Sequence, residues 1–417
     1  MLCFRSYYDS KITKERLDKL FNAIVYEREH QISGYYHLPY STRALEDAKE
    51  YANNHFELLK GVKKLVILGV GGSSLGLRAI DKMLKSLQGR NHIQLVFLEY
   101  TDAIKISQLK LDIEECLFFV ISKSGTTIET SSLMKYAMQR YDLLKHKERL
   151  LFITDENSAL HLLGKDKQIT TITIDKNVGG RFSVLSSIAL VPLFLLGYKI
   201  EGFLKGARLF MDSFFERQED HLLNKACQLF DESLKYPMHA LFSYSDIFRG
   251  FNAWFVQLVG ESLGKINIHN KKVGLTPIAL IGSSDQHSFL QLLKHGPKDK
   301  SITFLSLCQN MRLEFDEPLV PSLDLPYFEN TNFVNQASFT RLLDLQKLAT
   351  LKSLVEEGLL VDCIEIAELN EKSVGMLIAY YELLTSALGI LFEINTYDQP
   401  AVEFGKAYLK EMFSLQK

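Results

Sequence analysis

The sequence predicts an α/β protein with two parallel β-sheets, each flanked by helices, and with helical segments at both ends. Chain length is the first reason, because 417 residues exceed what one ordinary hydrophobic core holds, so two core-bearing domains are expected. The second reason is a repeated alternation. Short apolar runs, typical of buried strands, alternate with amphipathic segments of helical period, as in parallel sheets covered on both faces.

The first half of the chain is expected to hold a helical segment followed by the first sheet. Residues 1–60 have mixed charge around apolar positions such as Leu17, Leu20 and Ile24, which favours helix. Residues 61–200 form the predicted first domain, in which we expect five buried strands. These are Leu65–Leu68, Leu95–Leu98, Leu117–Ile121, Leu150–Ile153 and Thr171–Ile174.

The second half repeats this organisation. A mostly helical stretch follows residue 182, and the predicted second domain covers residues 225–340. Residues 341–417 are again expected to be helical. The strands expected in the second domain are Ala240–Phe242, Ile278–Ile281, Ile302–Leu307 and a weaker segment near Leu319.

The composition is that of an ordinary globular protein, with 47% hydrophobic and 24% charged residues. A net charge of -2 gives no attraction to nucleic acid or to an anionic membrane. The longest apolar stretch, Ile188–Leu196, is far short of the roughly 20 residues that a membrane helix needs. The N-terminus lacks the features of a signal peptide. We therefore expect a soluble protein of the cytoplasm.

Cysteine usage agrees with that location. The chain has five cysteines, an odd number at wide spacing, so neither a disulfide framework nor a zinc site is indicated. Reduced thiols are the simplest interpretation. The five are Cys3, Cys116, Cys227, Cys308 and Cys363.

A turn rich in hydroxyl groups follows the predicted strand that ends at Ile121. Ser122, Ser124, Thr126 and Thr127 occupy four of its first six positions. The carboxyl ends of parallel strands face the ligand crevice, and the next helix offers free backbone N–H groups and a positive dipole end. One or two hydroxyls would suggest an ordinary helix cap. Four of them favour a site for a phosphate monoester.

A glycine-rich turn follows the first predicted strand. Gly71, Gly72 and Gly76 are similar to the GxGxxG loop of dinucleotide-binding proteins, and Glu99 ends the next strand, where an acidic partner would stand. The spacing is imperfect, however. Two turns in one sheet that could each bind phosphate fit a sugar phosphate better than a dinucleotide, because Gly72 and Ser73 would let the backbone approach the sugar.

Gln257, Glu261 and Lys265 lie four residues apart and would share one face of a predicted helix. A solvent-facing Glu–Lys pair is the simple interpretation. The alternative is a partly desolvated carboxylate base, because the opposite face of the helix is apolar.

Three further residues have both a structural and a chemical interpretation. Arg181 follows a flexible glycine pair and is either a surface side chain or a fixed cation. His287 follows the strand Ile278–Ile281 and a turn, and is either structural or a proton shuttle. Lys406 stands in a mostly apolar helical context, where a solvated lysine is the default.

Taken in order, six motifs resemble those of the phosphoglucose isomerase family, in its short bacterial form. The resemblance covers residues 69–406. It implies two sugar-isomerase (SIS) domains and the reversible isomerisation of glucose 6-phosphate and fructose 6-phosphate through a cis-enediol intermediate, without a cofactor or metal. The motifs are GVGGSSLG at 69–76, SKSGTTIET at 122–130, GGRFSV at 179–184, GESLGK at 260–265, DQHS at 285–288 and YDQPAVEFGK at 397–406.

The resemblance also implies a role for each motif. Glu261 corresponds to the general base that moves a proton between C1 and C2, and Arg181 to the cation beside the enediolate. His287 and Lys406 correspond to the ring-opening pair. The phosphate cradle corresponds to Ser122, the backbone of Lys123, Ser124 and Thr127. The sugar contacts correspond to Gly72, Ser73, Gln257 and Gln399.

The same family likeness implies a homodimer with a shared active site, because the matching histidine comes from the neighbouring subunit. Residues 341–417 are expected to pack back on that site. Three positions depart from the family pattern without removing a proposed catalytic group. Leu263 replaces a usual Asn, Pro400–Ala401 replaces Trp-Gly, and Gly125 stands where longer relatives often have an aromatic residue.

Two alternatives remain open at this point. A SIS-type sugar-phosphate sensor without catalysis would keep the hydroxyl-rich turn but would not need Glu261, Arg181 or His287. An isomerase that also accepts mannose 6-phosphate would share the phosphate end of the site. A dehydrogenase is the least favoured class, because the glycine-rich turn fits that loop poorly.

Overall fold

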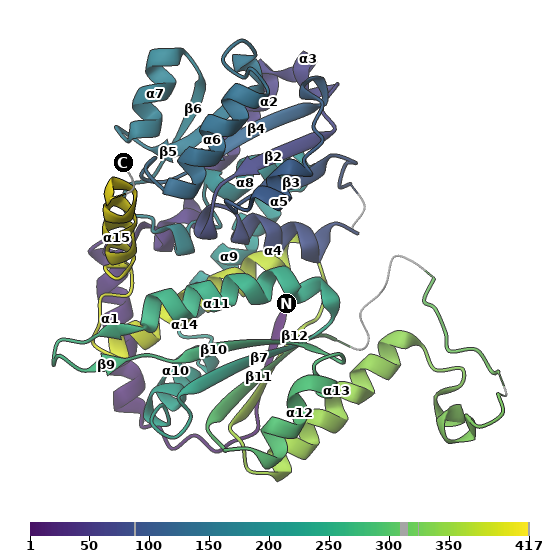
Figure 1. Cartoon of the computed structure of the whole chain (residues 1–417). Helices are drawn as coiled ribbons and strands as arrows, with labels where there is room; N and C mark the ends of the chain where they lie inside the picture. Colours follow the sequence, from purple (N-terminus) through teal and green to yellow (C-terminus); the bar gives the residue numbers. More distant parts are fainter. Residues whose placement is uncertain (87–88, 309–315, 324, 416–417) are drawn as a thin grey trace.

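The computed structural model describes residues 1–86, 89–308, 316–323 and 325–415 (Figure 1). Within them lie two five-stranded sheets and a short two-stranded hairpin. This confirms the predicted α/β class with helices around parallel sheets.

The first sheet contains the five expected strands, all parallel, in the order β3-β2-β4-β5-β6. The chain order reverses between β2 and β4, and Leu68 of β2 pairs with Val120 of β4. The turns after these two strands therefore lie side by side at the carboxyl edge, where ligands bind in such sheets. The strands are β2 (Lys64–Leu68), β3 (Gln94–Leu98), β4 (Cys116–Ile121), β5 (Leu150–Asp155) and β6 (Thr170–Ile174).

Both faces of the first sheet are apolar, which explains its continuous hydrophobic runs. Alternate residues point to opposite faces of a strand. Phe119 packs into the main core with α2 (Arg43–Asn54), α4 (Leu75–Leu84) and α8 (Ser187–Leu195), whereas Phe118 packs into a second cluster with α6 (Ile128–Arg140) and α7 (Ala159–Lys167).

The second sheet has the order β1-β12-β11-β7-β10, and its first strand is antiparallel to the rest. Two of its strands correct the sequence prediction, because residues 1–60 and 341–417 were expected to be helical. The limits 225–340 therefore leave out both β1 and β12. The strands are β1 (Leu2–Ser6), β7 (Met238–Tyr244), β10 (Thr276–Gly282), β11 (Lys300–Leu307) and β12 (Val361–Ile366).

Two charged residues, one buried and one partly exposed, explain why β12 does not resemble a buried strand in the sequence. Asp362 and Glu365 interrupt its apolar pattern and point to opposite faces of the sheet. Lys225 binds Asp362 at 2.7 Å, and Lys347 binds Glu365 at 2.6 Å. β1 has only five residues, too few to show a period.

The expected strand near Leu319 is wrong. Leu319 forms only an isolated bridge with Ser338, and its side chain is exposed. It lies in a segment that extends away from the second sheet before α13 (Phe339–Glu356) (Figure 1).

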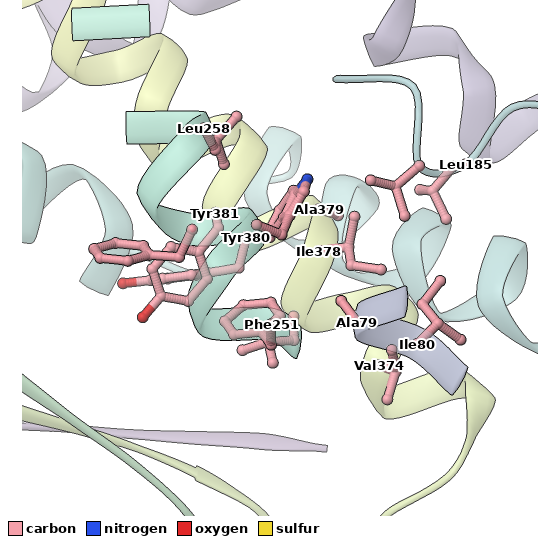
Figure 2. Packing of buried hydrophobic residues seen from close by; sticks show 14 of the residues in the cluster. Ala79, Ile80, Leu185, Phe251, Leu258, Val374, Ile378, Ala379, Tyr380 and Tyr381 are labelled. Atoms are coloured by element: carbon pink, nitrogen blue, oxygen red, sulfur yellow. The ribbon is translucent and has the colours of Figure 1, made fainter. Parts of the chain in front are cut away.

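A helical layer joins the two sheets into one core. At its centre, α14 (Glu371–Leu391) packs against α9 (Ile200–Phe215) and α11 (Arg249–Leu263). Figure 2 shows Tyr381 and Ile378 of α14 among Phe251 of α11 and Ile80 of α4. Because α4 and α11 belong to the two different halves, this cluster holds the sheets in fixed relation.

α14 is long and apolar enough to cross a membrane by length and composition, but 83% of its most apolar window is buried inside the protein. It packs as a core helix between the other helices (Figure 1).

The remaining elements complete the covering layers. The α-helices are α1 (Lys14–Glu29), α3 (Phe56–Leu59), α5 (Ala103–Ser107), α10 (His221–Asp231), α12 (Gln286–His295) and α15 (Val402–Leu415). The 3-10 helices are η1 (Gly34–Tyr40), η2 (Gly71–Ser73), η3 (Ile113–Glu115), η4 (Lys147–Arg149), η5 (Gly180–Phe182), η6 (Asp246–Phe248) and η7 (Glu329–Val334). The hairpin consists of β8 (Lys265–Ile266) and β9 (Lys272–Val273).

Candidate active site

Three segments meet where the two halves face each other: η2, η5 and the C-terminal part of α11. Their close approach depends on glycine. A Cβ on Gly71, which has φ +60°, would lie 2.5 Å from Gln257 Nε2, and a Cβ on Gly72 would collide with the carbonyl oxygen of Gly180. The glycine-rich turn, the GGR turn and the Glu261 helix are therefore in direct contact.

Arg181 is buried, with 4% of its area exposed, so the surface interpretation of this residue is wrong. Its guanidinium forms four hydrogen bonds and an ion pair with Glu261. Burial lowers the pKa of Arg181, and the carboxylates of Glu261 and Asp398 oppose that shift. Its partners are Ser262 Oγ (3.0 Å), Gln399 Oε1 (3.0 Å), Glu261 Oε1 (3.2 Å) and the carbonyl oxygens of Thr396 (3.0 Å) and Asp398 (3.1 Å).

Glu261 is held from both sides. Its Oε1 faces Arg181, and its Oε2 accepts a hydrogen bond from Gln257 Nε2 at 3.1 Å. The side chain keeps 29% of its area exposed, so one edge of the carboxylate remains reachable. Lys265 lies beyond the end of α11 at Leu263 and binds Asp398 instead. Of the two interpretations of this helix, the solvent-facing Glu–Lys pair is therefore wrong.

The hydroxyl-rich turn is ordered by its own side chains. The Oγ of Ser122 accepts from the Gly125 N–H at 3.2 Å and donates to Thr127 Oγ1 at 3.4 Å. Ser124 Oγ accepts from the Thr126 N–H at 3.2 Å. Thr127 precedes α6, and its side chain does not cap that helix. The backbone N–H groups at the start of α6 are therefore not blocked by Thr127.

Gly125 explains one departure from the family pattern. Its φ is +69°, and a Cβ would lie 2.5 Å from the backbone nitrogen of Leu160. An aromatic side chain would not fit here without moving α7.

Lys123 ties this turn to the turn that carries Arg181. Its Nζ donates to the carbonyl oxygens of Lys176 at 3.1 Å and Val178 at 2.9 Å, directly before Gly179. Asp155 lies 4.0 Å away, and burial raises its pKa to about 6 although Lys123 opposes the shift. The phosphate-type turn and the Glu261–Arg181 pair thus belong to one connected region.

His287 is not part of this region within one chain. It lies exposed in the first turn of α12, beyond the carboxyl end of β10. Gly260, next to Glu261, lies near Pro277 at the start of the same strand. β10 has seven residues, so the two sites are separated by roughly 20 Å of strand. Lys406 is half-buried on α15, on the side of the protein away from α12 (Figure 1).

Glu99 argues against a dinucleotide site. This residue is 6% exposed, and its carboxylate is bound by Arg78. A ribose hydroxyl would have to compete with that ion pair.

Several residues around Arg181 escaped the sequence analysis. Ser262 binds its Nε, and Trp254 Nε1 donates to its carbonyl oxygen at 3.3 Å. Tyr397 packs edge-on against Phe182, the residue after Arg181. Trp254 is the only tryptophan of the chain and lies one helical turn before Gln257. That position was the one sequence signal that could have pointed to it.

The parallel sheets, the hydroxyl-lined turn at a topological switch point and the buried arginine–carboxylate pair define an α/β protein of the sugar-isomerase (SIS) type. The Phosphoglucose isomerase family model matches residues 52–416. The chain therefore belongs to the phosphoglucose isomerase family, as the six motifs indicate.

Individual relatives agree with this assignment. A protein of Campylobacter jejuni named glucose-6-phosphate isomerase is 40% identical over 91% of this chain and 92% of its own length. The solved structure of a hypothetical protein from Thermus thermophilus has a TM-score of 0.85 and 27% identity, covering 95% of this chain and 94% of its own. A glucose-6-phosphate isomerase from Chlamydia trachomatis shares the fold, with a TM-score of 0.78 and 22% identity, covering 100% of this chain and 89% of its own.

Proposed function

We propose that this protein interconverts glucose 6-phosphate and fructose 6-phosphate in the cytoplasm, by ring opening and proton transfer through a cis-enediol intermediate, without a cofactor. The observation that carries the proposal is the position of Glu261. Its carboxylate is held between Arg181 and Gln257, in the same region as the hydroxyl-lined turn.

The proton transfer follows from these contacts. Glu261 takes the proton from C2 of the open-chain aldose and returns it to C1, and Gln257 keeps the carboxylate oriented. The enediolate formed between these steps carries negative charge on oxygen. Arg181 is a fixed cation beside that charge, and its other donors are already bound, so little reorganisation is needed.

The phosphate end relies on neutral donors. A dianion at the turn would accept hydrogen bonds from Ser122, Ser124 and Thr127, from the backbone of Lys123 and from the start of α6. Gly72, Ser73, Gln257 and Gln399 then contact the sugar between the two ends. This arrangement fixes C1 and C2 relative to Glu261.

Ring opening requires His287 and Lys406, and we propose that His287 comes from a second copy of the chain in a homodimer. The separation of His287 from Glu261 along β10 supports this assignment. Exposed apolar side chains on α15 and in the segment before α13 also favour a partner surface. They are Tyr408, Met412 and Phe413 on α15, and Tyr327, Phe328 and Phe333 in the other segment.

The main test uses the purified protein and fructose 6-phosphate, with glucose 6-phosphate formation coupled to a reporter enzyme. Glu261→Gln should abolish exchange of the C2 proton with solvent and still bind a sugar-phosphate analogue. The same assay with mannose 6-phosphate determines whether the broader isomerase applies. A sensor would show binding without turnover, and an active Glu261→Gln variant would exclude Glu261 as the base.

Mixing variants tests the shared site. Glu261→Gln and His287→Ala homodimers should each be inactive, because each removes a group from both sites. Mixed dimers contain one site with both native residues, so random exchange should restore about a quarter of the wild-type activity. Absence of any restored activity in verified mixed dimers would place His287 and Glu261 in the same subunit's site. An active His287→Ala homodimer would remove His287 from the mechanism.

A further inference from the structure

Lys265 ends the GESLGK motif, and the proposed mechanism gives it no role. Its side chain is only 8% exposed. The Nζ donates to the carbonyl oxygens of Asn395 at 2.6 Å and Asp398 at 2.8 Å, and lies 2.9 Å from Asp398 Oδ1. An ammonium group has three N–H donors, so all of them are directed at one short segment, residues 395–398.

This segment directly precedes two groups of the proposed site, Gln399 and Lys406, in the chain. Gln399 follows it and accepts from Arg181, and the chain then enters α15, which carries Lys406. Arg181 also donates to the carbonyl oxygens of Thr396 and Asp398. The Asp398 carbonyl thus accepts from both cations.

The opposite side of the segment is bound to the protein core. The hydroxyl of Tyr397 forms a hydrogen bond with the carboxylate of Glu27 and lies 3.0 Å from Ser386 Oγ. Residues 395–398 are therefore fixed on one side by the bonds of Tyr397 to the core and on the other side by Lys265 and Arg181.

Lys265 also limits the interaction between the Asp398 carboxylate and the Arg181 guanidinium. Asp398 lies close enough to Arg181 to oppose the lowering of the arginine's pKa. Because Lys265 forms the ion pair with the Asp398 carboxylate, that carboxylate is not left as a free competitor for the guanidinium that must serve the enediolate.

We propose that Lys265 is a positioning residue: its ammonium fixes residues 395–398, and through them holds Gln399 beside Arg181 and sets the direction in which α15 presents Lys406. This role rests on the proposed isomerase function. Lys265 touches neither substrate carbon nor phosphate in this account, so it acts only through the segment that it binds.

The kinetic test compares Lys265→Met with Lys265→Arg. The methionine keeps most of the side-chain volume and removes the donors. We expect kcat for fructose 6-phosphate to fall roughly 10- to 100-fold and KM to rise much less, because the phosphate turn, which follows β4 in the other half of the protein, keeps its contacts. Lys265→Arg should recover part of kcat, since it restores charge and donors. The matched control is Lys272→Met, on the exposed strand of the same hairpin, which should leave both constants unchanged.

A second measurement does not depend on activity. Amide hydrogen exchange should accelerate in Lys265→Met over residues 395–401 and in α15, and should stay unchanged in the phosphate turn and in α6. Wild-type kcat together with wild-type exchange in this variant would overturn the proposal. Faster exchange throughout the protein, with equal losses in kcat and substrate affinity, would also overturn it, because that result describes general destabilisation.

The two measurements separate this proposal from the proposed function. If the wild-type protein failed to isomerise fructose 6-phosphate, the proposed function would fall. Local acceleration of exchange in Lys265→Met would still establish that Lys265 fixes residues 395–398.

Discussion

The two sheets of this protein both have parallel central strands, but they bury different kinds of side chain. In the first sheet every residue of β4 is buried and apolar. In the second sheet, Asp362, Thr303 and His239 lie on neighbouring strands and form a buried polar network with Lys225. Burial and the nearby Lys225 lower the pKa of His239 to about 3, so this ring stays neutral.

The functional ends differ in the same way. The turn after β4 presents hydroxyl and backbone donors, whereas Arg181 and Glu261, one from each half of the protein, form a pair of fixed charges. A dianionic phosphate brings its own charge and needs only oriented donors. A transition state that develops charge needs a cation already in place. The variants below test this division, from the largest expected effect to the smallest.

Lys225→Met should destabilise the second sheet most. The Nζ of Lys225 lies 2.7 Å from Asp362 Oδ2 and 2.6 Å from Thr303 Oγ1, with the side chain 1% exposed. The variant leaves a buried carboxylate without its cation, so we expect the free energy of unfolding to fall by about 3–5 kcal/mol. Urea unfolding at pH 7 measures the loss.

A double variant provides the control. Lys225→Met combined with Asp362→Leu should recover most of the lost stability, because no charge remains unpaired. If the free energy of unfolding of Lys225→Met were within about 1 kcal/mol of the wild-type value, the ion pair would not be needed to keep Asp362 in the sheet.

Arg181→Lys should affect chemistry more than folding. An ammonium supplies three donors where the guanidinium supplies five, and it cannot reach all the partners of Arg181 at once. We expect kcat to fall about 10²- to 10³-fold, with a smaller change in KM. Arg249→Lys, at an exposed position of α11, is the control. A loss of less than about 10-fold would mean that a simple positive charge suffices at this place.

Ser122→Ala tests the neutral phosphate end. The serine is 3% exposed, and its hydroxyl both orders the turn and faces the predicted phosphate position. Loss of a hydrogen bond to a charged group should raise KM about 10-fold, with little change in kcat. Ser131→Ala serves as the comparison, because that hydroxyl donates only to the backbone carbonyl oxygens of Thr127 and Ile128. A fall in kcat without a rise in KM would argue against phosphate binding here.

Asp155→Asn should have the smallest effect and a definite dependence on pH. The folded protein raises the pKa of Asp155 from its ordinary value near 3.9 to about 6, chiefly by burial. The folded state therefore binds this proton more tightly than the unfolded state does, and the associated stability is lost as pH rises from about 4 to 6. The asparagine variant should be more stable than wild type at pH 7.5, by about 1 kcal/mol because the side chain is 24% exposed and partly screened by solvent, and less so at pH 4. Urea unfolding at both pH values tests this, and equal differences at the two would contradict it.

The elements with local sequence signals were predictable. Four strands of the first sheet were predictable because each contains an apolar run, and β6 because threonine and isoleucine alternate along it. The turns at Gly71 and Ser122 were predictable because they follow such runs. The strand β12 was missed, because Asp362 becomes acceptable in a core only when Lys225 reaches it from the distant helix α10. Glu365 is partly exposed and pairs with Lys347 of α13, the preceding helix.

The site shows the same limit. The resemblance identified Arg181 and Glu261, but their burial and mutual contact depend on three segments that meet only in the fold. The spacing of Glu261 and Lys265 suggested an ion pair on one helix. α11 ends before Lys265, so the lysine turns to Asp398, a contact that spans more than a hundred residues and has no local signal.

The strand pairing of β1 has a consequence for the order in which the protein assembles during synthesis. Every strand of the first sheet has left the ribosome once residue 174 emerges, so that half can fold on the nascent chain. Leu2 must wait for Ile366, its partner in β12. Residues 2–6 can therefore pair with β12 only after residue 366 has been made, so the second sheet gains β1 later than the first sheet gains its last strand.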